Sequence, residues 1–473
     1  MPKYAKIKER DIKVKQFHLL LMISFEDYIK KFEERISKYV VPQSEWGPVE
    51  KALYGVRDPY RVDPKEAKEL RFKAIKFQFK RQYEKNAFYR KLCKNRNLSP
   101  DDIKSHDDLL KIPLLEDKFF KKYPDGKDFA VWLANIFTGE LPEIEIRKKK
   151  PSYDDILKDF NSAGLVISHS SGTSGRHTFI PRDKRTFSMA EYSFAKAVVT
   201  MIYPYWEYDI SVYLLMPNPF KTFLFAGKVC SVLYDAVKDV TPAIDKKITT
   251  KLIGLLMRSR GIKAKIVRFS AALSNRKMIK RIVSWLEENE RKGRKTAFIG
   301  APYILHEVME YLRKEGKTFS FGDRGAVVTG GGWKIQEDKR LPVDVFREDV
   351  EKILGINKEL CLDLYGMVEG NGAAIHCPEG HYLHLPTTFY YPLVVDENLE
   401  PIGYGEYGRF AFLDATAYSY PGFIVTGDRV RMLEHCPVCD RPGPVLEPEV
   451  KRVRGEEVRG CAEEVRRMLS IES

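Results

Sequence analysis

Ser168-His169-Ser170-Ser171-Gly172-Thr173-Ser174-Gly175 follows directly after the apolar run Leu165-Val166-Ile167. Glycines let a backbone approach a ligand closely, and consecutive N–H groups form a nest for an anion. The hydroxyls of Ser170, Ser171, Thr173 and Ser174 add donors for phosphate oxygens. The stretch therefore predicts a phosphate-binding loop after a strand, although a plain polar turn would have the same composition.

Two other loop classes are excluded by the residues around this stretch. A Walker A loop continues with Gly-Lys-Ser/Thr, whereas Gly175 is followed by Arg176-His177-Thr178. The nucleophile elbow of α/β-hydrolases requires Gly-x-Ser-x-Gly, which this loop lacks.

The chain beyond the loop alternates short apolar runs with helical stretches, and Gly or Pro turns end many of the runs. This alternation predicts an α/β fold with βαβ units and a largely parallel sheet. After Pro386 the pattern becomes strand-rich and is punctuated by glycines, which indicates a small β subdomain. The predicted strands are Leu165–Ile167, Val212–Met216, Thr296–Gly300, Ala326–Thr329 and Leu362–Tyr365.

The chain before the loop is predicted to be mainly helical, with apolar residues at three- and four-residue spacing from Asp63 to Asn86. We expect four regions: an N-terminal helical region (1–150), an α/β nucleotide-binding core (151–385), a β subdomain (386–435) and a short tail (436–473). Lys148–Pro151 would form the first linker, and Ala462–Leu469 a terminal helix. The first 21 residues are very basic, so translation could start at Met1 or at Met22.

Composition limits the class of protein. Of 473 residues 44% are apolar, no run is long enough for a membrane span, and no signal-peptide cleavage site follows Phe17–Phe25, so we expect a cytoplasmic protein. The net charge of +14, from 80 basic and 66 acidic residues, favours anionic partners such as nucleotides, CoA or an acidic carrier protein. A surface rich in ion pairs, with only five glutamines, explains this charge equally well without any nucleic acid.

Three further motifs follow the loop in order: Gly330-Gly331-Gly332-Trp333-Lys334, Tyr365-Gly366-Met367-Val368-Glu369 and Thr426-Gly427-Asp428. Together with Ser170–Gly175 they resemble the adenylate-forming superfamily of acyl-CoA synthetases. The resemblance implies that the fold is the large domain of these enzymes, with two α/β lobes and a small β subdomain. Two departures stand out: the loop lacks the family's usual lysine, for which Arg176 or Lys184 could substitute, and Val368 replaces a threonine.

The resemblance also implies a role for each motif. Ser170, Ser171, Gly172, Thr173, Ser174 and Gly175 would bind the phosphates of ATP, with Thr173 also a catalytic residue. Gly331, Gly332, Tyr365 and Gly366 would lie around the adenine, and Asp428 would hold the ribose hydroxyls. Glu369 would bind Mg²⁺, which suits a hard carboxylate oxygen.

Two branches of the superfamily are most similar, the phenylacetate-CoA ligases and the LuxE-type acyl-protein synthetases. Both carry a Cys/His group after the Tyr-Gly motif, here Cys377, His384, Cys436 and Cys439. Four such ligands fill the tetrahedral shell of Zn²⁺ and leave no open position, so the expected site is structural. The alternative ligands are His376, His381 and His435, and the alternative to a metal site is a set of reduced thiols.

The tail decides between the branches. Typical members continue into a mobile C-terminal domain with a catalytic lysine, whereas only residues 440–473 follow the last of these cysteines. The ending resembles that of the LuxE type, which implies that Cys461 accepts the acyl group. Arg454, Arg459 and a helix start would lower its pKa and favour the thiolate. The alternative is a small residue that caps a terminal helix.

The sequence thus predicts an ATP- and Mg²⁺-dependent, AMP-forming ligase that transfers an acyl group to a thiol, as an acyl-protein synthetase. A phenylacetate-type acyl-CoA ligase and a non-catalytic nucleotide-binding subunit are the two alternatives. The expected partners are a fatty or aryl carboxylic acid and, as acceptor, an acyl reductase, a carrier protein or CoA. The acyl pocket is predicted between Val212–Phe225 and Ala301–Tyr303, with Tyr213, Phe220, Phe223, Phe225 and Tyr303 as its aromatic side chains. These residues suit an apolar or aryl chain, but they suit a protein core equally well.

Overall fold

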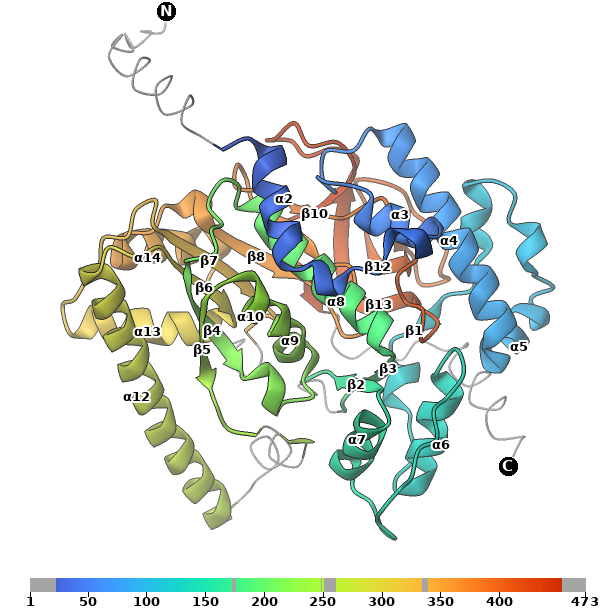
Figure 1. The fold of residues 1–473 in the computed structure, drawn as a ribbon, viewed down its shortest axis with the longest axis horizontal. Helices are drawn as coiled ribbons and strands as arrows, with labels where there is room; N and C mark the ends of the chain where they lie inside the picture. Colours follow the sequence, from blue (N-terminus) through green and yellow to red (C-terminus); the bar gives the residue numbers. More distant parts are fainter. Residues whose placement is uncertain (1–22, 172–175, 248, 251–260, 334–338, 453–473) are drawn as a thin grey trace, which may run out of the picture.

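The computed structural model describes residues 23–171, 176–247, 249–250, 261–333 and 339–452, and for 261–274 and 452 it describes the backbone alone. Figure 1 shows a large sheet flanked by helices, with the N-terminal helices lying over its C-terminal strands. Within these ranges, no helix is both long and apolar enough to cross a membrane.

Helices joined by short 3₁₀ turns build the N-terminal part. The helix predicted between Asp63 and Asn86 is confirmed as α4, Pro64–Lys85, and the Asp63 side chain caps it by accepting from the backbone N–H groups of Lys65 and Glu66. The other elements up to residue 162 are α2 (Phe25–Arg35), η1 (Ser37–Tyr39), η2 (Gln43–Glu45), α3 (Pro48–Tyr54), α5 (Ala87–Asn95), η3 (Pro100–Asp102), η4 (Asp107–Lys111), β1 (Leu115–Glu116), η5 (Phe119–Lys121), α6 (Lys127–Ile136) and α7 (Tyr153–Ser162).

Helix α4 is fixed to the far end of the sequence. The buried side chains of Gln78 and Gln82 both donate hydrogen bonds to the carbonyl of Ala417, which is more than 330 residues away along the chain. Thr388 Oγ1 donates to the carbonyl of Ala52 at 2.7 Å. Buried polar groups without such partners would be costly, so these bonds specify how the helical part docks.

The large sheet has the strand order β11-β12-β13-β14-β10-β9-β8-β7-β6-β4-β5, and β1 and β15 pair with β13. Strands β5, β4, β6, β7 and β8 pair in parallel, as predicted for this part of the chain. The strands are β4 (Ser211–Pro217), β5 (Asp239–Ile244), β6 (Thr296–Gly300), β7 (Gly325–Gly330), β8 (Cys361–Tyr365), β9 (Ala374–His376), β10 (Leu383–His384), β11 (Tyr390–Val395), β12 (Tyr407–Asp414), β13 (Phe423–Leu433), β14 (Val445–Leu446) and β15 (Lys451–Arg452).

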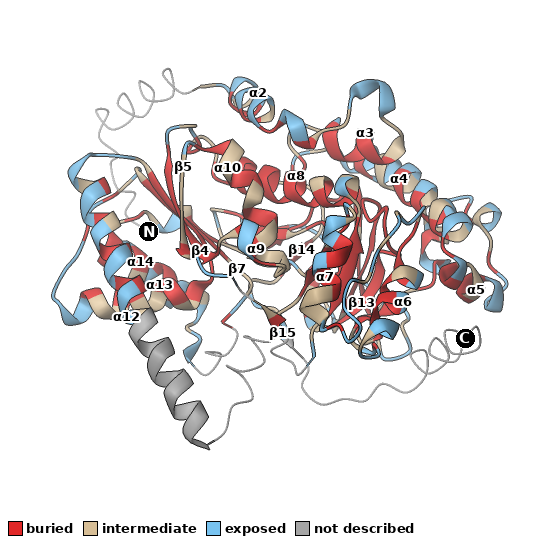
Figure 2. Ribbon diagram, turned by 60° about the horizontal axis from the view of Figure 1, so that its bottom comes forward, coloured by how far each residue is buried: buried red, intermediate tan, exposed pale blue. Residues whose placement is uncertain are grey.

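Helices cover both faces of the parallel strands. The chain moves from β4 to β5 in one direction along the sheet and from β5 to β6 and β7 in the other, so right-handed crossovers place the connecting helices on opposite faces. Figure 2 shows the strands between them as buried, together with nearly all of α8. The helices are α8 (Lys184–Met201), α9 (Phe225–Lys228), α10 (Leu233–Ala236), α12 (Gly261–Arg291), α13 (Pro302–Lys314) and α14 (Val343–Leu354), with the 3₁₀ turns η6 (Pro219–Lys221), η7 (Val229–Val232) and η9 (Lys358–Leu360).

The strand before the phosphate loop differs from the prediction. β2 (Val166–His169) does not join the parallel sheet but pairs antiparallel with β3 (Phe179–Arg182) in a separate two-stranded sheet. The reason is the short connection: parallel neighbours need a crossover of a dozen or more residues, whereas the loop returns after nine. The loop is therefore the tip of a hairpin and not the start of a βαβ unit.

Candidate active site

The Tyr-Gly and Thr-Gly-Asp motifs meet side by side. Tyr365, the last residue of β8, donates its hydroxyl to Asp428 Oδ2 at 2.8 Å. Burial raises the pKa of Tyr365 well above its usual value, and the neighbouring Asp428 carboxylate raises it further. Two side chains that are predicted to hold adenine and ribose thus share one hydrogen bond, although 63 residues separate them.

Each motif was expected to follow an apolar strand, but Thr426-Gly427-Asp428 lies inside β13. In the pairing of β13 with β12, Arg409 faces Arg429 and Ala411 faces Val425, so three residues of β13 stand opposite one residue of β12. This bulge coincides with the motif. Thr426 Oγ1 donates to the Phe410 carbonyl and accepts from the Asp428 N–H, which fixes the bulged backbone.

Glu369 lies in the turn between β8 and β9 and is 7% exposed. Its pKa is raised, first by burial and then by the nearby carboxylate of Asp117, while Lys121 opposes the shift. A buried carboxylate beside a second carboxylate suits a cation, because a cation would remove both penalties.

Arg182 holds the turn that carries Glu369. This fully buried guanidinium donates to the Val368 carbonyl at 2.6 Å, to Asn371 Oδ1 at 2.9 Å and to Ser168 Oγ at 2.8 Å. Tyr420, a further Arg182 partner, donates to the Glu369 carbonyl at 3.0 Å. The network joins the start of the phosphate loop to the Tyr-Gly motif. Sequence analysis missed it because Arg182, Asn371 and Tyr420 belong to no motif.

The phosphate loop is described at its two ends. Ser170 closes the hairpin with Thr178, whose carbonyl accepts from the Ser170 N–H and whose N–H donates to Ser170 Oγ. The Nδ1 atoms of His169 and His177 both lie 2.8 Å from the Ser170 carbonyl, and since a carbonyl only accepts, both must donate. Ser171 is half-buried, and Gly172, Thr173, Ser174 and Gly175 lie outside the described residues.

Arg176 and Lys184 were the suggested substitutes for the loop lysine. Within the described part of the chain, the structure gives neither of them a hydrogen bond to a motif residue. Arg176 donates to the Tyr123 carbonyl at 3.1 Å and stacks on the Tyr123 ring at 4.5 Å. Lys184 is exposed at the first turn of α8.

The glycine motif adjoins Tyr365 through the sheet. Gly330 ends β7 and pairs with Leu364 of β8. Gly331 and Gly332 have φ values of 79° and 70°, which favour glycine, so the turn needs these residues. Trp333 is buried against His306 and Phe346, and Lys334 lies outside the described residues.

The four cysteine and histidine side chains come together. The ligand atoms of Cys377, His384, Cys436 and Cys439 all lie within 4.8 Å of one another. Cys439 Sγ is 3.4 Å from His384 Nε2, and the Sγ atoms of Cys377 and Cys436 are 4.0 Å apart. Burial raises the pKa of the Cys377 thiol to about 12, which a bound cation would reverse.

The alternative histidines are directed elsewhere. His376 accepts from the Asp363 N–H at 3.1 Å, His381 contacts Arg347 through Nδ1, and the side chain of His435 is 75% exposed. The geometry therefore favours His384 as the fourth ligand. Cys461 lies outside the described residues.

The predicted acyl pocket is only partly compatible with the structure. Tyr213 is 1% exposed and packs edge-to-face on Trp285, so it belongs to the core because its β4 side chain points inward. Phe220 is 67% exposed and contacts Tyr234 at the surface. Phe223 remains next to the phosphate loop, since its carbonyl accepts from the His169 N–H at 2.9 Å.

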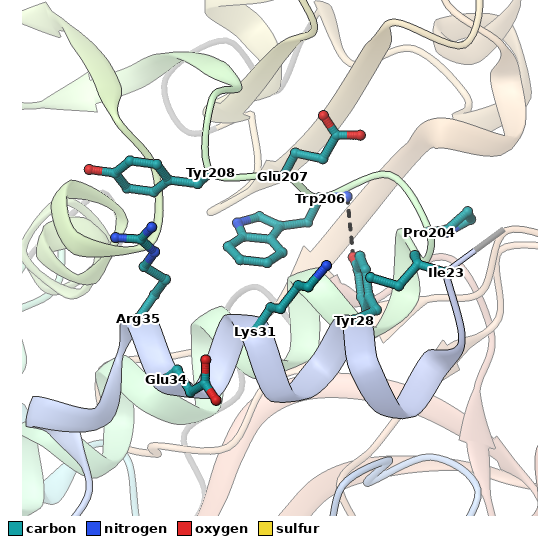
Figure 3. Close-up of a pocket in the computed structure, with 9 residues that line it drawn as sticks. All are labelled: Ile23, Tyr28, Lys31, Glu34, Arg35, Pro204, Trp206, Glu207 and Tyr208. Carbon is teal, nitrogen blue, oxygen red and sulfur yellow. Dashed lines mark hydrogen bonds between the residues drawn. The ribbon is translucent and has the colours of Figure 1, made fainter. Parts of the chain in front are cut away.

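A cavity of about 670 Å³ lies away from every motif, between α2 and residues 204–208 (Figure 3). Trp206 forms its floor, and the Trp206 N–H donates to Tyr28 Oη at 3.2 Å. Its charged lining residues are two of each sign, Lys31, Arg35, Glu34 and Glu207.

Comparisons with known proteins agree with the motifs. The sequence model of the family described as "Acyl-protein synthetase, LuxE" matches residues 244–470. The chain is 24% identical to the long-chain-fatty-acid–luciferin-component ligase of Vibrio harveyi over 411 residues, covering 85% of this chain and 89% of the relative. For the ligase of the same name from Aliivibrio fischeri the identity is 24% over 404 residues, with 84% and 88% covered.

The fold matches solved adenylate-forming ligases. For 2-hydroxyisobutyryl-CoA ligase in the postadenylation state the TM-score is 0.56 at 15% identity, covering 89% of this chain and 75% of that chain. For the same ligase in the thioesterification state the values are 0.56, 15%, 87% and 73%. The predicted resemblance and fold class are therefore confirmed: the chain is similar to LuxE-type acyl-protein synthetases and has the fold of adenylate-forming ligases.

Proposed function

We propose that this relative of the LuxE acyl-protein synthetases is an AMP-forming ligase, which activates a carboxylic acid as acyl-AMP and passes the acyl group to a thiol. The observation that carries the proposal is the Tyr365–Asp428 contact beside Glu369. It gathers an aromatic ring, a ribose-binding carboxylate and a buried metal-binding carboxylate at one place, which are the groups that a nucleotide and its cation require.

Two displacements make up the reaction. The carboxylate of the acid attacks the α-phosphorus of ATP, and pyrophosphate leaves. A thiolate then attacks the acyl carbonyl, and AMP leaves. Because little covalent chemistry falls to the protein in the first step, positioning and charge stabilisation carry it.

The motif residues supply these functions. Ser170 to Gly175, with Thr173 as the catalytic hydroxyl, would bind the phosphates, and Gly331, Gly332, Tyr365 and Gly366 would surround the adenine. Glu369 would hold Mg²⁺, which neutralises charge on the phosphates when bound. Cys377, His384, Cys436 and Cys439 would hold a structural Zn²⁺, supported by their mutual approach.

The substrate and the acceptor follow from the relatives. Their printed names specify a long-chain fatty acid, which favours a fatty acid over an aryl acid here. The acceptor would be Cys461, from which an acyl reductase or a carrier protein would take the acyl group. A reaction of this kind, which uses ATP and a thiolate, fits the cytoplasm.

Transfer to CoA is the second candidate, favoured by the CoA ligases that share the fold. Pyrophosphate release with ATP and a panel of fatty and aryl acids, with and without CoA, tests the proposal. Intact-mass spectrometry of the same mixtures, for wild type and Cys461→Ser, separates the acceptors. We expect a hydroxylamine-sensitive acyl adduct without CoA in wild type alone.

Two contrary results would identify the two alternative functions. Full thioester formation on CoA by the Cys461→Ser variant would identify an acyl-CoA ligase. ATP binding without pyrophosphate release for any acid would identify a non-catalytic nucleotide-binding subunit.

A further inference from the structure

The candidate site has an excess of negative charge before any nucleotide arrives. Glu369, Asp428 and Asp117 converge there, and Asp117 lies so close to the ribose motif that a Cβ at Gly427 would be 3.9 Å from Asp117 Oδ2. ATP adds further negative charge. A positive group besides the metal is therefore needed, and the loop lysine that usually provides it is missing.

Three other described cations near the motifs already have partners in the chain. Arg182 is fully buried, and its N–H groups are used by five acceptors, which leaves little for a ligand. Arg176 is bound to Tyr123. Arg409 donates to the Thr426 carbonyl at 3.1 Å and lies 3.6 Å from Glu116.

Lys121 differs from these groups because it pairs with Asp117, one of the carboxylates of the site. It ends η5, its side chain is 17% exposed, and its Nζ lies 2.6 Å from Asp117 Oδ2. An ammonium group has three N–H donors, and within the described ranges Lys121 directs one of them to Asp117. Its charge also acts on Glu369, whose carboxylate it stabilises.

The segment that carries Lys121 is fixed between two motif-bearing elements. β1 pairs in parallel with β13, so that Glu116 faces Val425, and the Asp117 N–H donates to the Val425 carbonyl at 3.0 Å. On the other side, Tyr123 packs edge-to-face on Phe179 of β3, the strand that leaves the phosphate loop. Lys121 is thus held between the ribose motif and the hairpin.

We propose that Lys121 takes over the role of the absent loop lysine, so that its ammonium binds the phosphates of ATP, while Asp117 positions it. The proposal rests on the proposed function and adds a catalytic residue from the N-terminal part of the chain. Lys121 stays protonated throughout: as the acid's oxygen bonds to the α-phosphorus and the bond to pyrophosphate breaks, its charge offsets the negative charge that develops.

The test compares Lys121→Met, Lys121→Arg and, as a matched control, Lys122→Met, which removes an exposed neighbouring lysine. Pyrophosphate release, the KM for ATP, ATP binding by calorimetry and the melting temperature are measured for each. We expect Lys121→Met to lose about 100-fold in kcat and about tenfold in ATP affinity, without a matching loss in melting temperature. Lys121→Arg should recover most of the activity, and Lys122→Met should stay within about twofold of wild type.

The outcomes separate the two proposals. If wild type binds no ATP and releases no pyrophosphate, the proposed function fails and this inference fails with it. If wild type is active and Lys121→Met stays within about threefold of it, only the assignment of Lys121 fails. Equal losses in Lys121→Met and Lys121→Arg that follow the melting temperature would show a purely structural ion pair. Lys121→Gln, which can still donate to Asp117, replaces the methionine variant if that variant does not fold.

Discussion

The proposed nucleotide site and the Cys/His cluster draw on neighbouring stretches of the chain but are built in opposite ways. Both take residues from the chain after β8 and from β13 or just beyond it. The nucleotide site buries carboxylates whose charges are not fully offset, as the raised pKa of Glu369 shows. The cluster brings four ligand atoms together within 4.8 Å and interlocks its two turns, since a Cβ at Gly380 would collide with Val438. We therefore expect the first region to serve a ligand at some cost to the stability of the fold, and the second region to stabilise the fold.

Glu369→Gln gives the largest expected effect. The change keeps the shape of the side chain but removes a ligand of Mg²⁺, so acyl-AMP formation should fall by about a thousandfold or more. Far-ultraviolet circular dichroism should show an intact fold. Near wild-type pyrophosphate release by this variant would contradict the site assignment and remove one side of the comparison.

Cys436→Ser should lower stability and retain activity, which is the reverse of the effect expected for Glu369→Gln. Loss of one ligand should release the metal and lower the free energy of unfolding by about 3 kcal/mol, measured as a fall in melting temperature. Pyrophosphate release at a temperature where the variant is folded should be retained. Metal analysis should give one zinc per wild-type chain. Glu434→Ala, which removes an exposed side chain two residues before Cys436, serves as the control. A metal-free wild type with an unchanged melting temperature would refute the structural role.

Tyr365→Phe tests the contact inside the nucleotide site. It removes the hydroxyl that holds Asp428 but keeps the ring for stacking, so the expected loss is one hydrogen bond, or about tenfold in the KM for ATP. The kcat for acyl-AMP formation should change less. An unaltered KM would mean that the Tyr365 hydroxyl is not needed to position Asp428.

The smallest expected effect is on the free energy of unfolding of Glu369→Gln, and it depends on pH. The folded-state pKa of Glu369 lies above its unfolded value, so this carboxyl stabilises the fold at low pH, and that contribution is lost as pH rises through the folded pKa. Glu369→Gln does not titrate. Without ligands it should therefore become more stable than wild type as pH rises, by about 1 kcal/mol, whereas Cys436→Ser should be less stable at every pH. Urea unfolding at pH 5 and pH 8 measures both.

The sequence predicted those features that depend on neighbours along the chain. The strands β4, β6, β7 and β8 lie where their apolar runs predicted them, and helix α4 lies within the stretch from Asp63 to Asn86 whose spacing predicted a helix. The grouping of Cys377, His384, Cys436 and Cys439 was also expected, but from the resemblance to two branches of the superfamily.

Features that depend on distant contacts were not predictable in this way. Arg182 contacts Val368 and Asn371, which lie 186 and 189 residues further along the chain. Asp117 reaches the ribose motif only because β1 pairs with β13. Tyr213 was expected in a ligand pocket but packs in the core. The sequence pattern around an aromatic residue in a strand is the same in both cases, so it could not distinguish them.

Strand β13 joins the two regions and links their evolution. It carries Asp428 at its centre, and Cys436 follows three residues after its last residue, Leu433. Side chains alternate between the faces of a strand, so inserting or deleting one residue between these positions would turn one region's side chains to the wrong face while leaving the other's in place. In an alignment of relatives, length changes should therefore be excluded from residues 428–436 and gather in the connection between β11 and β12, which neither region uses.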